Sequence, residues 1–296
     1  MNLLEKNKLG PKDRYAYKLI APSIIYLFFI LIVPLMFSLF LSSYDWSLIG
    51  NLRKFVGLNN YLKILSDKEV IHSLIITLVF VFVSVSVEFI LGLGIALLLN
   101  QPFKGEKIIR VILLLPMMIS PTIVALGWRL ILNSEKGVLN YLITLLGIHP
   151  QVWLGPDLAL PTIIAVEIWI STPFFMLIIL AALKSIPESL IEAAIVDGAN
   201  WWQRLTKVTL PMIRSITMVA FVFRTMFALR NFDLPWVLTS GGPANRTNVF
   251  SIELYRQAFS YYQIGNAAAM SWILLVITII ISIFYIKIIE RQESLY

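Results

Sequence analysis

The sequence has no cysteine and only two histidines, His72 and His149, among its 296 residues. Without cysteine, neither a disulfide framework nor a thiolate metal site is available. The two histidines stand apart, with no further ligand at metal-binding spacing, so we expect no metal site. Charged residues are also scarce, at 14% against 58% hydrophobic residues. Such a chain has more apolar surface than a soluble fold buries, and we expect the excess to face the lipid bilayer.

Sequence motifs of nucleotide and redox chemistry are missing as well. No phosphate-binding loop of the form GxxxxGKS or GxxxxGKT occurs, which excludes the chain as the ATPase of a transport system. Gly92 and Gly94 lack the third glycine of a dinucleotide site, and their spacing is more typical of close helix packing in a membrane. No cluster of His, Asp or Cys indicates a membrane enzyme. We therefore expect no catalytic residues and no cofactor on this chain.

Six apolar segments are long enough to cross about 30 Å of hydrocarbon at about 1.5 Å per helical residue. The first follows a basic stretch, as a secretion signal does. Its apolar run is too long for a signal, however, and no small-residue cleavage site follows, so we expect a retained helix. The fold class is therefore an all-α integral membrane protein with six transmembrane helices. The predicted spans are Leu19–Ser42, Leu74–Leu99, Val111–Leu132, Ala159–Leu183, Ile216–Leu238 and Ala267–Ile286.

The basic residues predict the orientation of these spans. The net charge is +7, but Lys and Arg lie in short clusters between apolar runs rather than on one face, so no nucleic-acid partner is expected. With the N-terminus inside, the inner segments hold fourteen basic residues and the outer loops hold seven. This asymmetry favours a multi-pass protein with both termini in the cytoplasm. The predicted organisation is a cytoplasmic tail at 1–18, a six-span domain at 19–289 and a second tail at 290–296.

The third predicted span contains two prolines, Pro116 and Pro121. Each removes a backbone donor and disturbs the preceding turn. Their close spacing predicts a bent helix beside a transport path.

The inner loop at 184–213 is predicted to fold into two short helices. Pro187 suits the first turn of a helix, and Gly198 is placed to end it in a left-handed conformation. Asn200 and Gln203 match a capping pair for a second helix, which we expect Pro211 to terminate. A folded loop of this kind suggests a contact with a partner.

Two interpretations of this loop remain open on its residues alone. Its first helix offers Ala193, Ala194 and Ile195 between acidic side chains, a small apolar ridge that fits a groove on a partner. Alternatively, the loop is amphipathic and lies on the membrane surface, which the adjacent Trp201 and Trp202 favour.

Several motifs in the chain resemble the permease subunits of ABC importers, and in particular their sugar-uptake branch. The inner loop carries Glu192-Ala193-Ala194, Gly198 four residues later, and Leu210-Pro211, which is similar to the EAA signature of that family. Motifs resembling the sugar branch are Phe55-Val56-Gly57-Leu58-Asn59-Asn60-Tyr61, Phe232-Asp233, Thr239-Ser240-Gly241-Gly242-Pro243, Tyr255 and Ala258-Phe259. Ser240 in place of a glycine, and Pro235-Trp236, depart from the usual pattern.

The resemblance implies a function, a set of partners and a location. The chain would be the non-catalytic permease of a bacterial inner-membrane importer that moves a sugar or oligosaccharide, an acidic sugar or a polyol included. Its partners would be a second, similar permease subunit, two cytoplasmic ATPase subunits that bind ATP and Mg, and an external solute-binding protein. The residues implied to couple the ATPase are Glu188, Glu192, Ala193, Ala194, Asp197, Gly198, Ala199, Leu210 and Pro211.

Charged side chains inside the predicted spans are candidates for the solute path, because each is costly in lipid unless it is paired or hydrated. One helical face carries Arg224, Ala228 and Asn231 at spacings of four and three residues. Two structural explanations compete: Arg224 could pair with Glu88, and Arg230 could pair with Asp233 three residues along the same helix. The candidate path residues are Glu88, Glu167, Arg224, Arg230, Asn231 and Asp233, and Arg129 is a further charge within a span.

An ion-coupled secondary transporter of a polar solute is the alternative function. It would also use carboxylates within the membrane. It has no use for a folded docking loop, however, and such proteins often contain an internal repeat. No clear repeat is present here.

Overall fold

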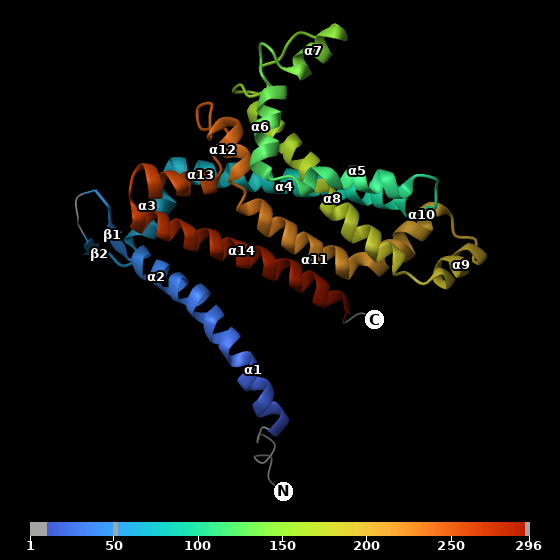
Figure 1. Cartoon of the computed structure of the whole chain (residues 1–296), viewed down its shortest axis with the longest axis horizontal. Coiled ribbons are helices and arrows are strands. Elements are labelled where there is room, and N and C mark those ends of the chain that lie inside the picture. Colours follow the sequence, from blue (N-terminus) through green and yellow to red (C-terminus); the bar gives the residue numbers. More distant parts are fainter. Residues whose placement is uncertain (1–10, 50–52, 294–296) are drawn as a thin grey trace. The chain divides into compact units, whose positions relative to one another are not determined.

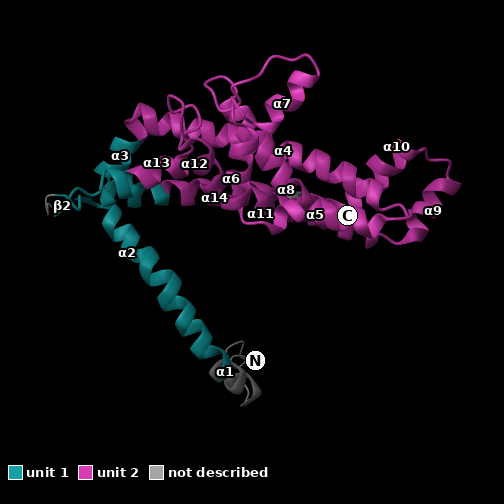
Figure 2. Cartoon of the chain, turned by 45° about the horizontal axis from the view of Figure 1, so that its top comes forward, with its two compact units in different colours: residues 1–64, 257–272 teal, residues 65–256, 273–296 magenta. Residues whose placement is uncertain are grey.

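The computed structural model describes residues 11–49 and 53–293, and side chains within 19–288 of that range (Figure 1). The chain divides into two compact units, residues 1–64 with 257–272 and residues 65–256 with 273–296 (Figure 2). The predicted tails at 1–18 and 290–296 fall largely outside the described side chains. Helices α3 and α14 contribute residues to both units.

The first unit begins with one long helical segment that leads into a β-hairpin. The hairpin is antiparallel, and Asn60 fastens it to this segment by donating to the carbonyls of Ser42 at 2.8 Å and Tyr44 at 2.9 Å. A Cβ atom on Gly265 would lie 2.0 Å from the Tyr44 carbonyl, so glycine is required there. The elements are α1 (Pro11–Leu27), the π-helix η1 (Phe28–Ile32), α2 (Val33–Ser42), β1 (Tyr44–Trp46), β2 (Arg53–Phe55), α3 (Asn59–Ser66), η3 (Arg256–Ser260) and α14 (Ile264–Glu293).

The second unit contains the helical bundle. Helices α4, α8 and α11 pack together, with the short helices α9 and α10 at one end and α12 and α13 at the other (Figure 1). Its elements are α4 (Lys68–Leu99), α5 (Glu106–Met118), α6 (Pro121–Ile131), α7 (Val138–Leu145), α8 (Ala159–Lys184), α9 (Glu188–Val196), α10 (Trp201–Arg204), the π-helix η2 (Leu205–Thr209), α11 (Leu210–Leu229), α12 (Asp233–Thr239) and α13 (Phe250–Tyr255).

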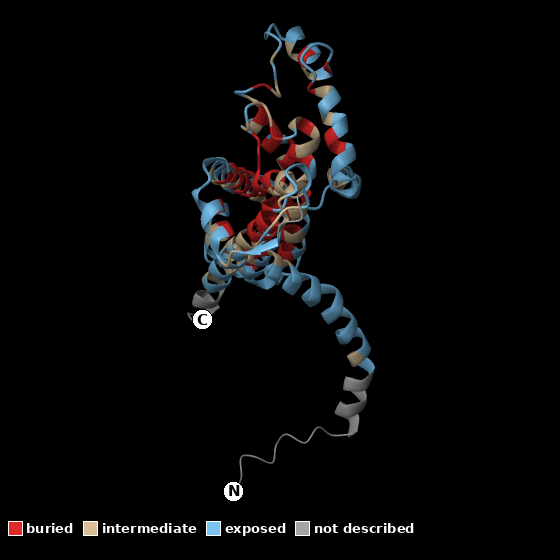
Figure 3. Cartoon of the chain, turned by 90° about the vertical axis from the view of Figure 1, so that its left-hand side faces the viewer, coloured by how far each residue is buried: buried red, intermediate tan, exposed pale blue. Residues whose placement is uncertain are grey.

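The distribution of buried residues fits a protein dissolved in lipid. Many of the buried residues, red in Figure 3, belong to α4, α8 and α11. Large apolar side chains of the same helices are exposed, among them Phe82, Trp169 and Phe223. The span at Leu19–Ser42 has no buried residue in its most apolar stretch, which leaves that helix free to face lipid or another chain. Four of the other predicted spans correspond to long apolar helices.

The third predicted span is bent, as its prolines indicate. Helices α5 and α6 meet at an angle of 95° and count together as one broken span. Ile119 and Ser120 between them are extended, because the residue before Pro121 is driven out of the helical region. In the described part of the chain, five long apolar helical segments and this bent pair therefore make up the six spans.

The fifth predicted span contains a break in its helix. Helix α11 ends at Leu229 and α12 begins at Asp233. Pro235 explains the break, because it has no N–H to donate to the carbonyl four residues earlier, that of Asn231. Ser251 Oγ donates to this carbonyl instead, at 2.6 Å.

The α4–α8 contact depends on Gly92. A Cβ atom at this position would lie 2.6 Å from Phe175 Cβ and 2.9 Å from the Met176 nitrogen, so the two helices approach closely there. The prediction of close packing is therefore confirmed for Gly92. It is wrong for Gly94, where a Cβ atom would meet nothing within 4 Å.

We expect Gly92→Ala to destabilise the chain by about 1–3 kcal/mol, because the added methyl group must push backbone atoms of α8 apart from α4. Thermal unfolding of the purified protein in detergent measures this effect. Gly94→Ala is the matched control on the same helix and should leave the melting temperature unchanged or slightly raised. Equal melting temperatures for the two variants would contradict the close approach.

Candidate functional site

The loop between α8 and α11 ends its first helix in a well-defined motif. Gly198 has φ +78°, in the left-handed region that only glycine adopts without strain. Its N–H donates to the Ile195 carbonyl at 3.0 Å, and the Ala199 N–H donates to the Ala194 carbonyl at 2.9 Å. This pair of bonds is a Schellman motif, so the sequence prediction of a glycine-terminated helix is confirmed.

The second helix of the loop begins with a reciprocal cap. Asn200 Oδ1 accepts from the Gln203 N–H, and Gln203 Oε1 accepts from the Asn200 N–H, both at 2.9 Å. This capping box satisfies two backbone donors that the first turn of a helix leaves unpaired. Arg204 adds a bond from Nη1 to the Ala199 carbonyl at 2.8 Å, which fixes the turn between the two helices.

The prediction that Pro211 ends this second helix is wrong. Helix α10 continues through the π-helix η2 into α11, and Pro211 lies in the first turn of α11. The π-helical turn changes the hydrogen-bond spacing just before the proline, so the missing donor does not interrupt the chain of helical residues. The loop is therefore joined to a transmembrane helix without a flexible segment.

Helix α9 projects with its side chains uncovered. None of its residues is buried, and Val196 at its end is 86% exposed. Glu188, Glu192 and Ala193 are exposed and Ala194 is half-buried. The remaining predicted coupling residues lie at the helix end and at the start of α11: Asp197, Gly198, Ala199, Leu210 and Pro211.

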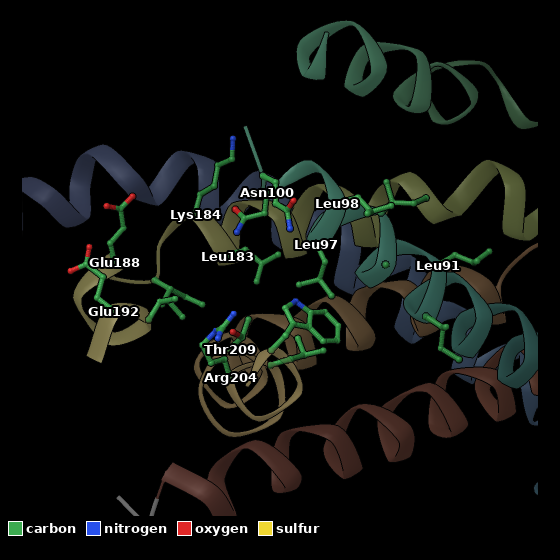
Figure 4. A pocket seen from close by; sticks show the side chains of 18 residues that line it. Leu91, Leu97, Leu98, Asn100, Leu183, Lys184, Glu188, Glu192, Arg204 and Thr209 are labelled. Carbon is green, nitrogen blue, oxygen red and sulfur yellow. The ribbon is translucent and has the colours of Figure 1, made fainter. Parts of the chain in front are cut away.

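A pocket of about 1170 Å³ separates this loop from the ends of α4 and α8 (Figure 4). Leucines of α4, Leu91 and Leu97 among them, line one side, and Glu188 and Glu192 lie on the other. Lys184 at the end of α8 lies beside it and pairs with Glu106 of α5 at 3.4 Å. Glu106 also pairs with Arg110 within α5. This ion pair across two helices was not predicted, since Glu106 and Lys184 are far apart in the sequence.

The predicted path residues Glu88, Glu167 and Arg224 form a buried ionic group. Arg224 Nε and Nη2 donate to the two carboxylate oxygens of Glu88, at 2.6 and 2.8 Å. Arg224 Nη2 also donates to Glu167 Oε1. Glu88 is 0% exposed and the other two are 5% exposed. Together with Asn231, whose amide donates to Glu167 Oε2 at 2.7 Å, we call these residues the ionic cluster.

The prediction that Arg230 and Asp233 neutralise each other on one helix is wrong. Helix α11 ends just before Arg230 and α12 begins at Asp233. Arg230 Nε donates to the Met226 carbonyl at 3.3 Å, and its guanidinium lies over the Phe227 ring. Asp233 occupies the first turn of α12, where a negative charge is favourable. Arg129 donates to the Val237 carbonyl. Among the six candidate path residues and Arg129, ionic pairing is thus confined to Arg224 and its two carboxylates.

Three aromatic side chains from the helices of the ionic cluster pack together, and sequence analysis missed them. Phe89, Phe175 and Phe221 come from α4, α8 and α11, with ring centroids 4.9 to 5.8 Å apart. Phe89 follows Glu88 directly, and Phe221 lies one turn before Arg224. No local sequence pattern distinguishes these three rings from other membrane phenylalanines.

Most of the chain matches a known protein family. Residues 88–293 match the family described as the binding-protein-dependent transport system inner membrane component. The chain belongs to this family. It is therefore the membrane permease component of an ABC importer, in which ATP hydrolysis resides on a separate subunit. Within the described residues, no group of three or more His, Cys, Asp or Glu side chains is placed to hold a metal ion.

Relatives with similar sequences cover nearly the whole permease. The trehalose/maltose transport system permease protein MalF of Thermococcus litoralis is 38% identical, over 95% of this chain and 97% of that protein. A probable ABC transporter permease protein of Sinorhizobium fredii is 39% identical, over 88% of this chain and 85% of its own length. These matches give no support to an ion-coupled secondary transporter.

A solved structure shares the fold of the permease. It is a chain of a bacterial alginate ABC transporter in complex with an alginate pentasaccharide-bound periplasmic protein. The TM-score is 0.81 at 26% identity, with 93% of each chain covered.

Proposed function

We propose that this permease imports a sugar or oligosaccharide, delivered by an external solute-binding protein, and that α9 transmits the action of ATPase subunits to the membrane helices. The observation that carries the coupling role is the loop itself. A Schellman motif, a capping box and a continuous helix into α11 hold an exposed α9 rigidly. A tether would need none of these features, and a rigid projection suits a mechanical contact.

The proposed partners follow the architecture of the family. They are a second, similar permease subunit, two ATPase subunits that bind ATP and Mg, and the solute-binding protein. The complex of an alginate transporter with a periplasmic protein supports the last of these. A sugar as the solute is supported by the trehalose/maltose permease among the relatives, and an acidic sugar by the alginate transporter.

We propose that the solute passes the break between α11 and α12. Arg230 and Asp233 are exposed there and Asn231 is half-buried, so all three present polar groups to a solute. Arg230 offers the guanidinium that an acidic sugar would need. Glu88, Glu167 and Arg224 are buried and bonded to one another, which makes them less suited to direct contact.

One prediction of this proposal concerns the coupling of the loop to the ATPase. Glu192→Lys reverses a charge on the exposed side of α9. Gly198→Val should strain the end of α9, since a β-branched side chain at positive φ is a steric outlier. We expect both variants to insert in the membrane and to lower ATP-driven uptake by about fivefold or more. Uptake in proteoliposomes and co-purification of the ATPase measure the effect.

Two control variants test whether the loss of uptake is specific to the loop. Glu135→Lys reverses an exposed charge between α6 and α7, and Gly127→Ala adds a methyl group where nothing lies within 4 Å. Both should transport normally. Normal transport by Glu192→Lys and Gly198→Val as well would remove the loop from the mechanism.

A further prediction of this proposal concerns the orientation of the chain in the membrane. We propose that α9 and both termini lie in the cytoplasm. The chain has no cysteine, so single cysteines can be introduced without background. An impermeant thiol reagent applied outside intact cells should label cysteines at the exposed positions Asn59 and Arg246. It should not label one at Gln203, which becomes reactive once the membrane is opened. The reverse pattern would overturn the orientation.

A further inference from the structure

The ionic cluster joins three helices by side chains that are far apart in sequence. Arg224 of α11 bonds Glu88 of α4 through two parallel N–H···O bonds and bonds Glu167 of α8 through the same guanidinium. Ser171 Oγ donates to Glu167 at 3.2 Å and helps to orient its carboxylate. Bidentate, charge-assisted bonds of this kind fix distance and angle together. In a low-dielectric interior, breaking one would leave a charge without a partner.

One continuous helix connects the ionic cluster to the loop between α8 and α11, which we call the docking loop. The chain is helical from Trp201 through η2 to Leu229. At about 1.5 Å per residue, Trp201 lies roughly 35 Å from Arg224 along this helix. A displacement of the loop end therefore reaches the cluster through a rigid element rather than through a linker.

The cluster also reaches the helices at the opposite end of the bundle. Asn231, which bonds Glu167 through its side chain, lies in the break between α11 and α12. Its carbonyl accepts from Ser251 of α13. The N–H of Phe250 in α13 donates to Thr77 Oγ1 of α4 at 2.7 Å. Helices α12 and α13 are thus held to the bundle through Asn231 on one side and Thr77 on the other.

We propose that the ionic cluster is a mechanical junction that passes movement of α11, driven from the docking loop, to α12 and α13 at the solute end. Glu88, Glu167 and Arg224 act in it as positioning residues. The proposal rests on the proposed coupling role of the loop. It deepens that role by naming the groups that connect the two ends of the permease.

The distribution of bonds explains why Glu167 is the critical member. Glu88 and Arg224 make a self-sufficient pair with complementary charges. Glu167 adds the link to α8 and, through Asn231, the link to the break. Replacing it by glutamine leaves the neutral pair intact, so the fold should survive while the connection to the solute end weakens.

The test uses the complete importer in proteoliposomes, with both permease subunits, the ATPase and the solute-binding protein. For Glu167→Gln we expect an assembled complex that still hydrolyses ATP, with solute imported per ATP lowered by about fivefold or more. The concentration of loaded binding protein at half-maximal uptake should not change. Glu167→Asp keeps the charge and should restore part of the ratio. Glu69→Gln, the same replacement at an exposed position of α4, is the control and should behave as the parent.

A second variant keeps the proposal testable if Glu167→Gln does not assemble. Ser251→Ala removes only the donor to the Asn231 carbonyl and touches no charge. It too should lower import per ATP while the melting temperature stays near that of the parent. The junction would be overturned if an assembled Glu167→Gln complex and the Ser251→Ala variant both import as much solute per ATP as the parent. A change confined to half-saturation would instead make Glu167 a solute contact and also overturn it.

Failure of the junction and failure of the docking role give different results. Normal transport by Glu192→Lys, together with lowered import per ATP in Glu167→Gln, would show that the loop does not receive the movement. Both the docking role and the junction as proposed would then be overturned. If Glu192→Lys loses ATPase association while Glu167→Gln transports normally, docking stands and only the junction is removed.

Discussion

A guanidinium held between two carboxylates inside the helical bundle is the interaction on which the arrangement of α4, α8 and α11 depends. An isolated charge in lipid costs several kcal/mol, so Arg224 is tolerated only where Glu88 and Glu167 face it. Removing Arg224, which both carboxylates share, would leave buried charge without a partner, a loss that destabilises a protein by about 3–5 kcal/mol in other systems. Gly92 lets α4 approach α8 closely, and Phe89, Phe175 and Phe221 pack on one another between the same three helices. Packing and electrostatics therefore specify the same three-helix contact.

The two ends of the bundle differ in how firmly they are fixed. At one end, the Schellman motif and the capping box make the loop rigid, yet no residue of α9 is buried within the described chain. At the other end, the break at 230–232 interrupts the helix and replaces backbone bonds by bonds to Ser251 and Glu167. The proposed coupling requires this combination, a rigid loop that receives a movement and a break at which the helices can rearrange.

Local features of this structure could be predicted from the sequence, and contacts between distant residues could not. Gly198 and the pair of Asn200 with Gln203 act on their own neighbours, so their conformations follow from a few consecutive residues. The ion pairs of Arg224 join residues 136 and 57 positions apart. Composition suggested that such pairs exist, but helix packing decides which carboxylates meet the guanidinium.

Two prolines show that the effect on a helix depends on what replaces the missing N–H donor. Pro211 was expected to end a helix, but the π-helical turn before it absorbs the missing donor. Pro235 lies in the fifth predicted span, and the carbonyl it leaves free is bonded by Ser251 where the helix breaks. A sequence shows where the donor is absent, and only the fold shows what takes its place.

The most direct test of the central claim is a cross-link between α9 and the ATPase in the assembled importer. In the cysteine-free chain, a single cysteine at Ala193 should form an adduct with the ATPase subunit through a short bifunctional reagent, and one at Arg246 should form none. An importer that hydrolyses ATP and takes up solute, yet gives no ATPase adduct from Ala193, would contradict the account.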